Sequence, residues 1–180
     1  LLWVYGFNPV TTFSIMYLII IGYYILRFIL QAAVKKAVHH AIKDEEYVIV
    51  APTMRFFSWR VAAKSKTHYY VGRAYGRTIN IYDKFEIHPI PKTPIVEKAL
   101  EDPNLAAFVS FSPLYRWEIS EFENGVTEVR LIDLRYRSND RYPFVAVAHV
   151  DEDLNIVNSY TGWIYSEDKL QRKLQIGSSD

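Results

Sequence analysis

The chain has 180 residues, of which 50% are hydrophobic and 23% charged, and its formal net charge is +1. It contains no cysteine, which excludes disulfide bonds, thiolate metal ligands and a cysteine nucleophile and is typical of a cytoplasmic protein. Only four of its 21 lysine and arginine residues precede residue 44, so the remainder carries 17 basic against 20 acidic side chains, a mildly acidic balance that argues against a nucleic-acid partner.

The first 26 residues contain no charged side chain. Since an apolar helix of about 20 residues crosses a bilayer core, we predict a transmembrane segment at residues 1–30, with a helix at about 9–30 and Pro9 in its first turn. A buried core helix seldom lacks charge over such a length, and the sequence shows neither the basic segment nor the cleavage site of a signal peptide. The chain begins with Leu1 rather than methionine, so trimming or an incomplete reading frame would leave further membrane helices upstream.

A basic flank follows the apolar stretch and consists of Arg27, Lys35, Lys36 and Lys43. Because positive flanks stay in the cytoplasm, we predict a membrane protein with its N-terminus outside and its C-terminal domain cytoplasmic. Polar side chains recur at every fourth position from Arg27 to Lys43, which indicates that the helix continues as an amphipathic basic stalk at residues 31–43. We expect this stalk to pack on the domain that follows rather than to act as a lipid-binding device.

Residues 44–180 have the length of one domain and the pattern of an α+β fold. Alternating and β-rich runs predict strands at 47–52, 57–64, 68–75, 78–87, 115–122, 126–137, 144–151 and 155–160. Thr93 and Asp102 are expected to cap two short helices, each with proline at its first position, and a last helix is expected from Ser166. The predicted fold is therefore an N-terminal transmembrane helix and stalk followed by a mostly antiparallel β-sheet domain with two or three helices on one side.

The predicted strand at 126–137 carries charge on both faces. Its alternation brings Asp133 next to Arg135, with Arg137 beyond them. A carboxylate and a guanidinium at this spacing form either a structural ion pair, which is the commoner case, or part of a ligand-binding element. Together with Tyr142, these three residues form the candidate binding site that we select from the sequence.

Other catalytic or binding patterns are weak. The five histidines are scattered without the spacing of a metal site, so we predict no metal site in this chain. No serine lies in a G-x-S-x-G setting, and no catalytic residue is assigned. The many aromatic residues near Arg116, Arg135 and Arg137 favour core packing and cross-strand pairs over a surface that stacks on bases or anionic ligands.

Six blocks of sequence resemble the C-terminal region of the bacterial membrane-bound metal-dependent hydrolases of the YdjM/YfhP-like type. They are FVSFSP (108–113), RW (116–117), VRLIDLRYR (129–137), YPFVAV (142–147), SYTGW (159–163) and SEDKL (166–170). The resemblance covers most of the soluble region and implies a location in the bacterial inner (plasma) membrane. It implies a hydrolase with a divalent metal cofactor whose histidine and aspartate ligands lie on membrane helices upstream of this chain, only the last of those helices being present here.

Two functions follow as hypotheses. The first is the C-terminal part of a membrane-bound metal-dependent hydrolase, in which this soluble domain regulates the enzyme or binds substrate or a protein partner. The second is a non-catalytic binding or scaffold domain tethered to the lipid bilayer. Burial of Asp133 against Arg135, away from any cleft, would favour the second hypothesis.

Overall fold

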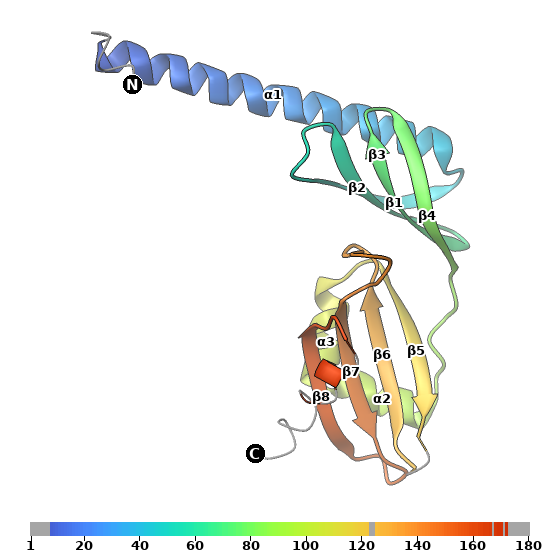
Figure 1. Cartoon of the computed structure of the whole chain (residues 1–180). Helices are drawn as coiled ribbons and strands as arrows, with labels where there is room; N and C mark the ends of the chain where they lie inside the picture. The colour runs from blue at the N-terminus through green and yellow to red at the C-terminus, as the bar shows by residue number, and fades with distance from the viewer. Residues whose placement is uncertain (1–7, 123–124, 167, 171, 173–180) are drawn as a thin grey trace.

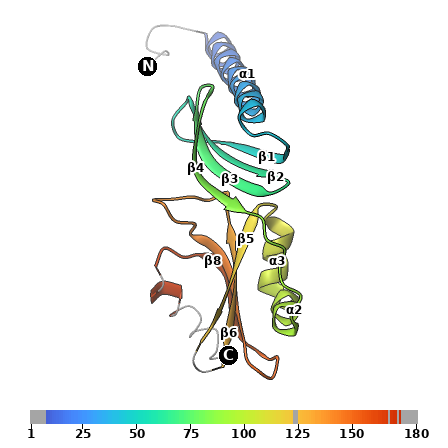
Figure 2. The same cartoon turned by 90° about the vertical axis from the view of Figure 1, so that its right-hand side faces the viewer.

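The computed structural model describes residues 8–122, 125–166, 168–170 and 172, so residues 1–7 of the predicted transmembrane segment lie outside it. A long helix, α1 (Pro9–Ala41), is followed by two four-stranded antiparallel sheets (Figure 1). Sheet A contains, in spatial order, β1 (Glu45–Pro52), β2 (Ser58–Ser65), β3 (His68–Tyr75) and β4 (Thr78–Glu86). Sheet B contains β5 (Tyr115–Glu121), β6 (Thr127–Asp133), β7 (Phe144–Val150) and β8 (Ile156–Trp163), and the helices α2 (Pro94–Glu101) and α3 (Pro103–Phe111) cover one of its faces (Figure 2).

Helix α1 runs without interruption through both the apolar segment and the stalk. Asn8 caps its first turn by accepting the N–H of Val10. An 18-residue window of this helix has a mean hydropathy of 2.0 and no buried residue, and among the described residues α1 is the one helix long and apolar enough to cross a membrane. The stalk differs, because Val34 and Val38 are buried against sheet A. Val34 lies on the predicted apolar side, but Gln31 of the predicted polar stripe also faces sheet A and donates to the Val50 carbonyl at 2.9 Å.

The strands occur where the alternation predicts them, but they form two sheets rather than one. Each strand pairs with the strand next to it in sequence, and the pairing stops after β4. Residues 87–93, which include two of the three prolines between 88 and 94, carry no strand and lead the chain to α2. Because proline cannot donate a ladder hydrogen bond, this segment ends sheet A and lets β5 begin a separate sheet.

The helix starts agree with the predicted caps. The side chain of Thr93 accepts the N–H of Val96 at the start of α2, and Asp102 accepts two N–H groups at the start of α3. Residues 168–170 and 172 are helical, which agrees with the last predicted helix, whereas Glu167 and the tail at 177–180 lie outside the described residues.

Apolar side chains gather in separate clusters rather than in a single core. Sheet A and α1 bury one cluster, which includes Val34, Val38, Trp59, Val61 and Ala63. Sheet B, α2 and α3 bury another, which includes Leu105, Phe108, Leu131 and Ala146. A smaller cluster joins the two sheets, where Ala62 and Val71 of sheet A meet Leu114 and Leu134 beside sheet B. We call this contact between the two sheets the seam.

Candidate functional site

The predicted pair Asp133–Arg135 exists and lies at the end of β6, where the strand stops four residues earlier than predicted. Asp133 is 0% exposed and accepts three hydrogen bonds from the Arg135 guanidinium, of 2.6 to 3.0 Å, and one of 2.8 Å from the Arg135 backbone N–H. The bond from the Arg135 backbone N–H to the Asp133 side chain competes with strand pairing and ends β6. Arg135 and Arg137 therefore do not continue the alternating face of β6. The hydrogen bonds from its guanidinium to Asp133 raise the pKa of Arg135.

Arg137 and Tyr142 bind the same carboxylate across the seam. Arg137 Nε and the Tyr142 hydroxyl donate to Asp83 Oδ2 of β4 at 2.5 and 2.6 Å, and Arg137 also donates to Asp140 at 2.7 Å. Burial alone would raise the pKa of Asp83, but the bonds from Tyr142 and Arg137 outweigh it and lower that pKa. Burial, and then the bond to Asp83, raise the pKa of Tyr142 far above its ordinary value. These three residues tie sheet B to sheet A.

Four arginines line a small pocket beside the seam. We call it the arginine pocket; its lining residues are Arg60, Val61, Val71, Gly72, Arg73, Tyr82, Arg135 and Arg137, and its volume is about 30 Å³. Arg60 and Arg73 are directly opposed on β2 and β3. Neither has an acidic partner in the described part of the chain, and the buried Nε of Arg73 makes no hydrogen bond there. Arg135 and Arg137, in contrast, are held by Asp133, Asp83 and Asp140.

This arrangement suits a small anion. Like charges directly opposed across strands repel each other, so Arg60 and Arg73 destabilise sheet A unless a negative group lies between or above them. Guanidinium groups bind phosphate and carboxylate oxygens in bidentate fashion. A volume close to that of one water molecule admits the oxygens of one such group and not a whole metabolite. Gly72, which is part of the lining, lets β3 and β4 approach closely, because a Cβ there would lie 2.3 Å from the Asn80 carbonyl oxygen.

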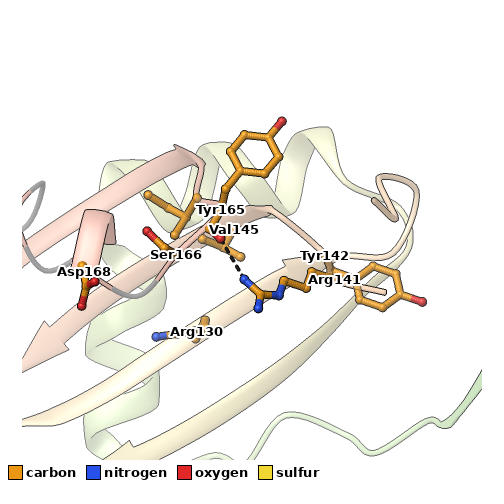
Figure 3. A pocket seen from close by; sticks show the side chains of 8 residues that line it. Arg130, Arg141, Tyr142, Val145, Tyr165, Ser166 and Asp168 are labelled. Carbon is orange, nitrogen blue, oxygen red and sulfur yellow. Dashed lines mark hydrogen bonds between the residues drawn. The ribbon is translucent and has the colours of Figure 1, made fainter. Parts of the chain in front are cut away.

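A larger pocket of about 460 Å³ lies on the other face of sheet B from α2 and α3 (Figure 3). It is lined by Arg130, Arg141, Tyr142, Val145, Ile164, Tyr165, Ser166 and Asp168. Its cations are already engaged, because Arg130 binds Glu128 at 2.8 Å and Arg141 donates to the Tyr165 carbonyl at 3.1 Å. Figure 3 shows the Tyr142 ring directed away from this pocket, in agreement with its bond to Asp83. The arginine pocket is therefore the stronger candidate for an anionic ligand.

A buried charge cluster on sheet B was not selected from the sequence. Glu128 is 4% exposed and binds both Arg130 and His149, the latter at 2.9 Å. The sequence gives no sign of this pairing, because the β6–β7 register that opposes Glu128 and His149 is not evident from either strand alone. Burial alone would raise the pKa of Glu128, but the hydrogen bond from His149 and the charge of Arg130 outweigh it and lower that pKa.

This cluster predicts a pH-dependent stability. A carboxyl group with a lowered folded-state pKa stabilises the protein above its unfolded pKa, near 4.5, and loses that contribution as the pH falls through the folded value. We therefore expect Glu128→Gln to destabilise the protein at pH 7 and the difference from wild type to shrink steadily below pH 4.5. Chemical unfolding at several pH values measures this, with the exposed Glu121→Gln as control. An equal difference at pH 7 and pH 3 would contradict the prediction.

The residues that the structure describes offer no fit for the divalent metal that the hydrolase resemblance implies. Among the described residues, no group of three or more histidine, cysteine, aspartate or glutamate side chains is placed to hold a metal ion. Glu128 and His149 bind each other and Arg130, and Asp133 is saturated by Arg135. No metal-dependent step can be derived for these residues.

Comparisons with known proteins match both sheets. Residues 43–85 match the family model of the YfhP middle domain, and residues 94–174 that of the YfhP C-terminal alpha/beta plait domain. Over 178 residues the chain is 48% identical to the uncharacterized protein YfhP of Bacillus subtilis (strain 168), an alignment that covers 98% of this chain and 54% of that protein. The chain thus spans about half the length of this relative. No solved structure matches the chain.

Proposed function

The chain belongs to the YfhP-like family, and from this premise we propose that it is a membrane-anchored, non-catalytic binding module on the cytoplasmic side of the bacterial inner membrane. In this proposal the apolar part of α1 is the anchor, the basic stalk faces the cytoplasm, and the arginine pocket binds a phosphate or carboxylate group of a ligand or protein partner. The module then holds the bound anionic group close to the membrane surface.

One observation carries the ligand assignment. Arg60 and Arg73 oppose each other without an acidic partner in the described region, while their neighbours Arg135 and Arg137 are fixed by three carboxylates. Two guanidinium groups held by carboxylates and two without a carboxylate partner among the described residues surround one small space, which gives a positively charged, pre-organised binding site. Asp133 and Tyr142 have positioning roles, because the first holds Arg135 and the second holds Asp83.

Inorganic phosphate tests this assignment. A phosphate concentration ten times the Kd stabilises a protein by about 1.4 kcal/mol, which for this chain length raises Tm by about 3–6 °C. We expect sodium phosphate, compared with sodium chloride of equal ionic strength, to raise the Tm of the full chain in detergent micelles. Arg60→Gln/Arg73→Gln should abolish the rise and should not lower the Tm without phosphate, because it removes a like-charge pair.

Arg77→Gln is the matched control, since Arg77 is an exposed arginine on the β3–β4 turn, outside the pocket lining. This variant should keep the full response to phosphate. If the double variant responds as the wild type does, or if phosphate has no effect on any of the three proteins, the anion assignment is wrong.

The metal-dependent hydrolase is a second candidate, and the length of the relative favours it. Almost half of Bacillus subtilis YfhP has no counterpart in this chain, which leaves room in that protein for a catalytic part. In that case the metal ligands lie outside this chain and the described domains bind substrate or regulate the enzyme. A hydrolysis screen of the full-length relative, with and without a chelator, separates the two functions.

A further inference from the structure

The loop between β1 and β2 exposes large apolar side chains. It consists of residues 53–57, Thr-Met-Arg-Phe-Phe. Met54 is 105% exposed relative to its reference value and Phe57 is 61% exposed. The Phe57 ring contacts Phe56, with 4.9 Å between centroids, but most of Phe57 and all of the Met54 side chain remain exposed, so the loop presents an apolar surface to the exterior.

This loop contacts α1 at the level where charge first appears in the sequence. Arg27, the first charged residue of the chain, donates to the Phe56 carbonyl at 2.5 Å, and its guanidinium lies 4.1 Å from the Trp59 ring centroid. One turn earlier on the helix, the Tyr23 ring lies 5.7 Å from that of Phe56. In Figure 1 the loop lies along the middle of α1, beside the start of the exposed apolar half.

These contacts fix the position of the loop along the bilayer normal. If the uncharged residues before Arg27 cross the hydrocarbon core, Tyr23 to Arg27 lie at its boundary, since four helical residues span only about 6 Å. Tyrosine, tryptophan and arginine are the side chains that collect at such a boundary. A groove of about 370 Å³ between α1 and the loop is lined partly by Tyr23, Tyr24, Phe28 and Trp59, and it opens at the same level.

We propose that the β1–β2 loop is a second membrane contact, which inserts Met54 and Phe57 at the boundary between lipid headgroups and acyl chains. The inference rests on the proposed anchoring by α1. It goes beyond anchoring because two contacts, one helical and one from sheet A, fix the orientation of the sheet against the bilayer. The arginine pocket then keeps one orientation relative to the membrane surface.

The absence of native cysteine allows a direct test with single cysteine variants of the full chain. Met54→Cys, Ile19→Cys and Lys66→Cys are each labelled with an NBD fluorophore and reconstituted into phosphatidylcholine–phosphatidylglycerol vesicles with or without brominated acyl chains. Lys66 is the matched control, because it is exposed in the β2–β3 turn at the other end of sheet A. We expect brominated lipid to remove most of the fluorescence at position 19, a substantial part at position 54 and none at position 66.

Each other result has a definite meaning. Quenching at position 19 without quenching at position 54 overturns the loop contact and leaves the anchor in place. No quenching at either position overturns the proposed anchoring as well. A blue-shifted but unquenched label at position 54 means that protein, either a partner or a second copy of the chain, covers the loop, and it also overturns the proposal.

Discussion

Asp133→Ala is expected to lower the free energy of unfolding by about 3–5 kcal/mol, the cost of removing one partner from a buried ion pair. The carboxylate is fully buried and accepts every bond that holds the Arg135 side chain, so its loss leaves a guanidinium that is only 16% exposed without a counter-charge. The Arg135 backbone N–H loses its acceptor as well. Arg135 cannot easily swing into solvent, because it stacks on Phe111 with 4.5 Å between guanidinium carbon and ring centroid.

Chemical unfolding in detergent micelles, followed by tryptophan fluorescence, measures this change. Asp140→Asn is the matched control, because it also removes a carboxylate from an arginine pair, that carboxylate is 86% exposed, and asparagine tolerates the φ of 61° at this position. Exposed pairs contribute about 0–1 kcal/mol, so the control should unfold nearly as the wild type does. Equal effects of the two substitutions would show that burial does not strengthen the Asp133–Arg135 pair.

Secondary structure was predictable because its signals are local. The strands follow from period-2 alternation, and the caps of α2 and α3 follow from Thr93 and Asp102, each directly before a proline. The continuation of the helix as a stalk follows from a four-residue polar repeat with Val34 and Ile42 on its apolar side, both of which are buried. Each of these patterns is complete within a short stretch of sequence, so no tertiary information was needed.

The arginine pocket could be predicted only in part. Asp133 and Arg135 are two residues apart, and their pairing was expected from that spacing. Asp83 is 54 residues from Arg137, and Arg60 opposes Arg73 only because the β2–β3 hairpin has its particular register. The first contact depends on how the two sheets meet and the second on the register of one hairpin, and neither is encoded in a single strand. The seam and the unpaired arginines were therefore missed.

Two truncations separate the anchoring role of α1 from its structural role. A variant that begins at Arg27 is expected to lose stable membrane integration, because it lacks the uncharged part of the helix, yet to keep both sheets folded. A variant that begins at Lys43 also lacks Val34, Val38 and Ile42, which are 0–3% exposed and cover sheet A. Burying each such side chain contributes about 1.5–3 kcal/mol, so sheet A should unfold or aggregate.

Carbonate extraction of membranes measures integration, and far-UV circular dichroism with thermal unfolding measures folding. The variant that begins at Arg27 should leave the membrane in carbonate, even though loop 53–57 can still hold it loosely to vesicles in low salt, because a few interfacial side chains bind far more weakly than a spanning helix. If it resists extraction as the full chain does, the apolar half of α1 is not the anchor. If the variant that begins at Lys43 folds as stably as the one that begins at Arg27, the buried stalk is not part of the core of sheet A. In that case the division of α1 into an exposed lipid-facing half and a packed half is wrong.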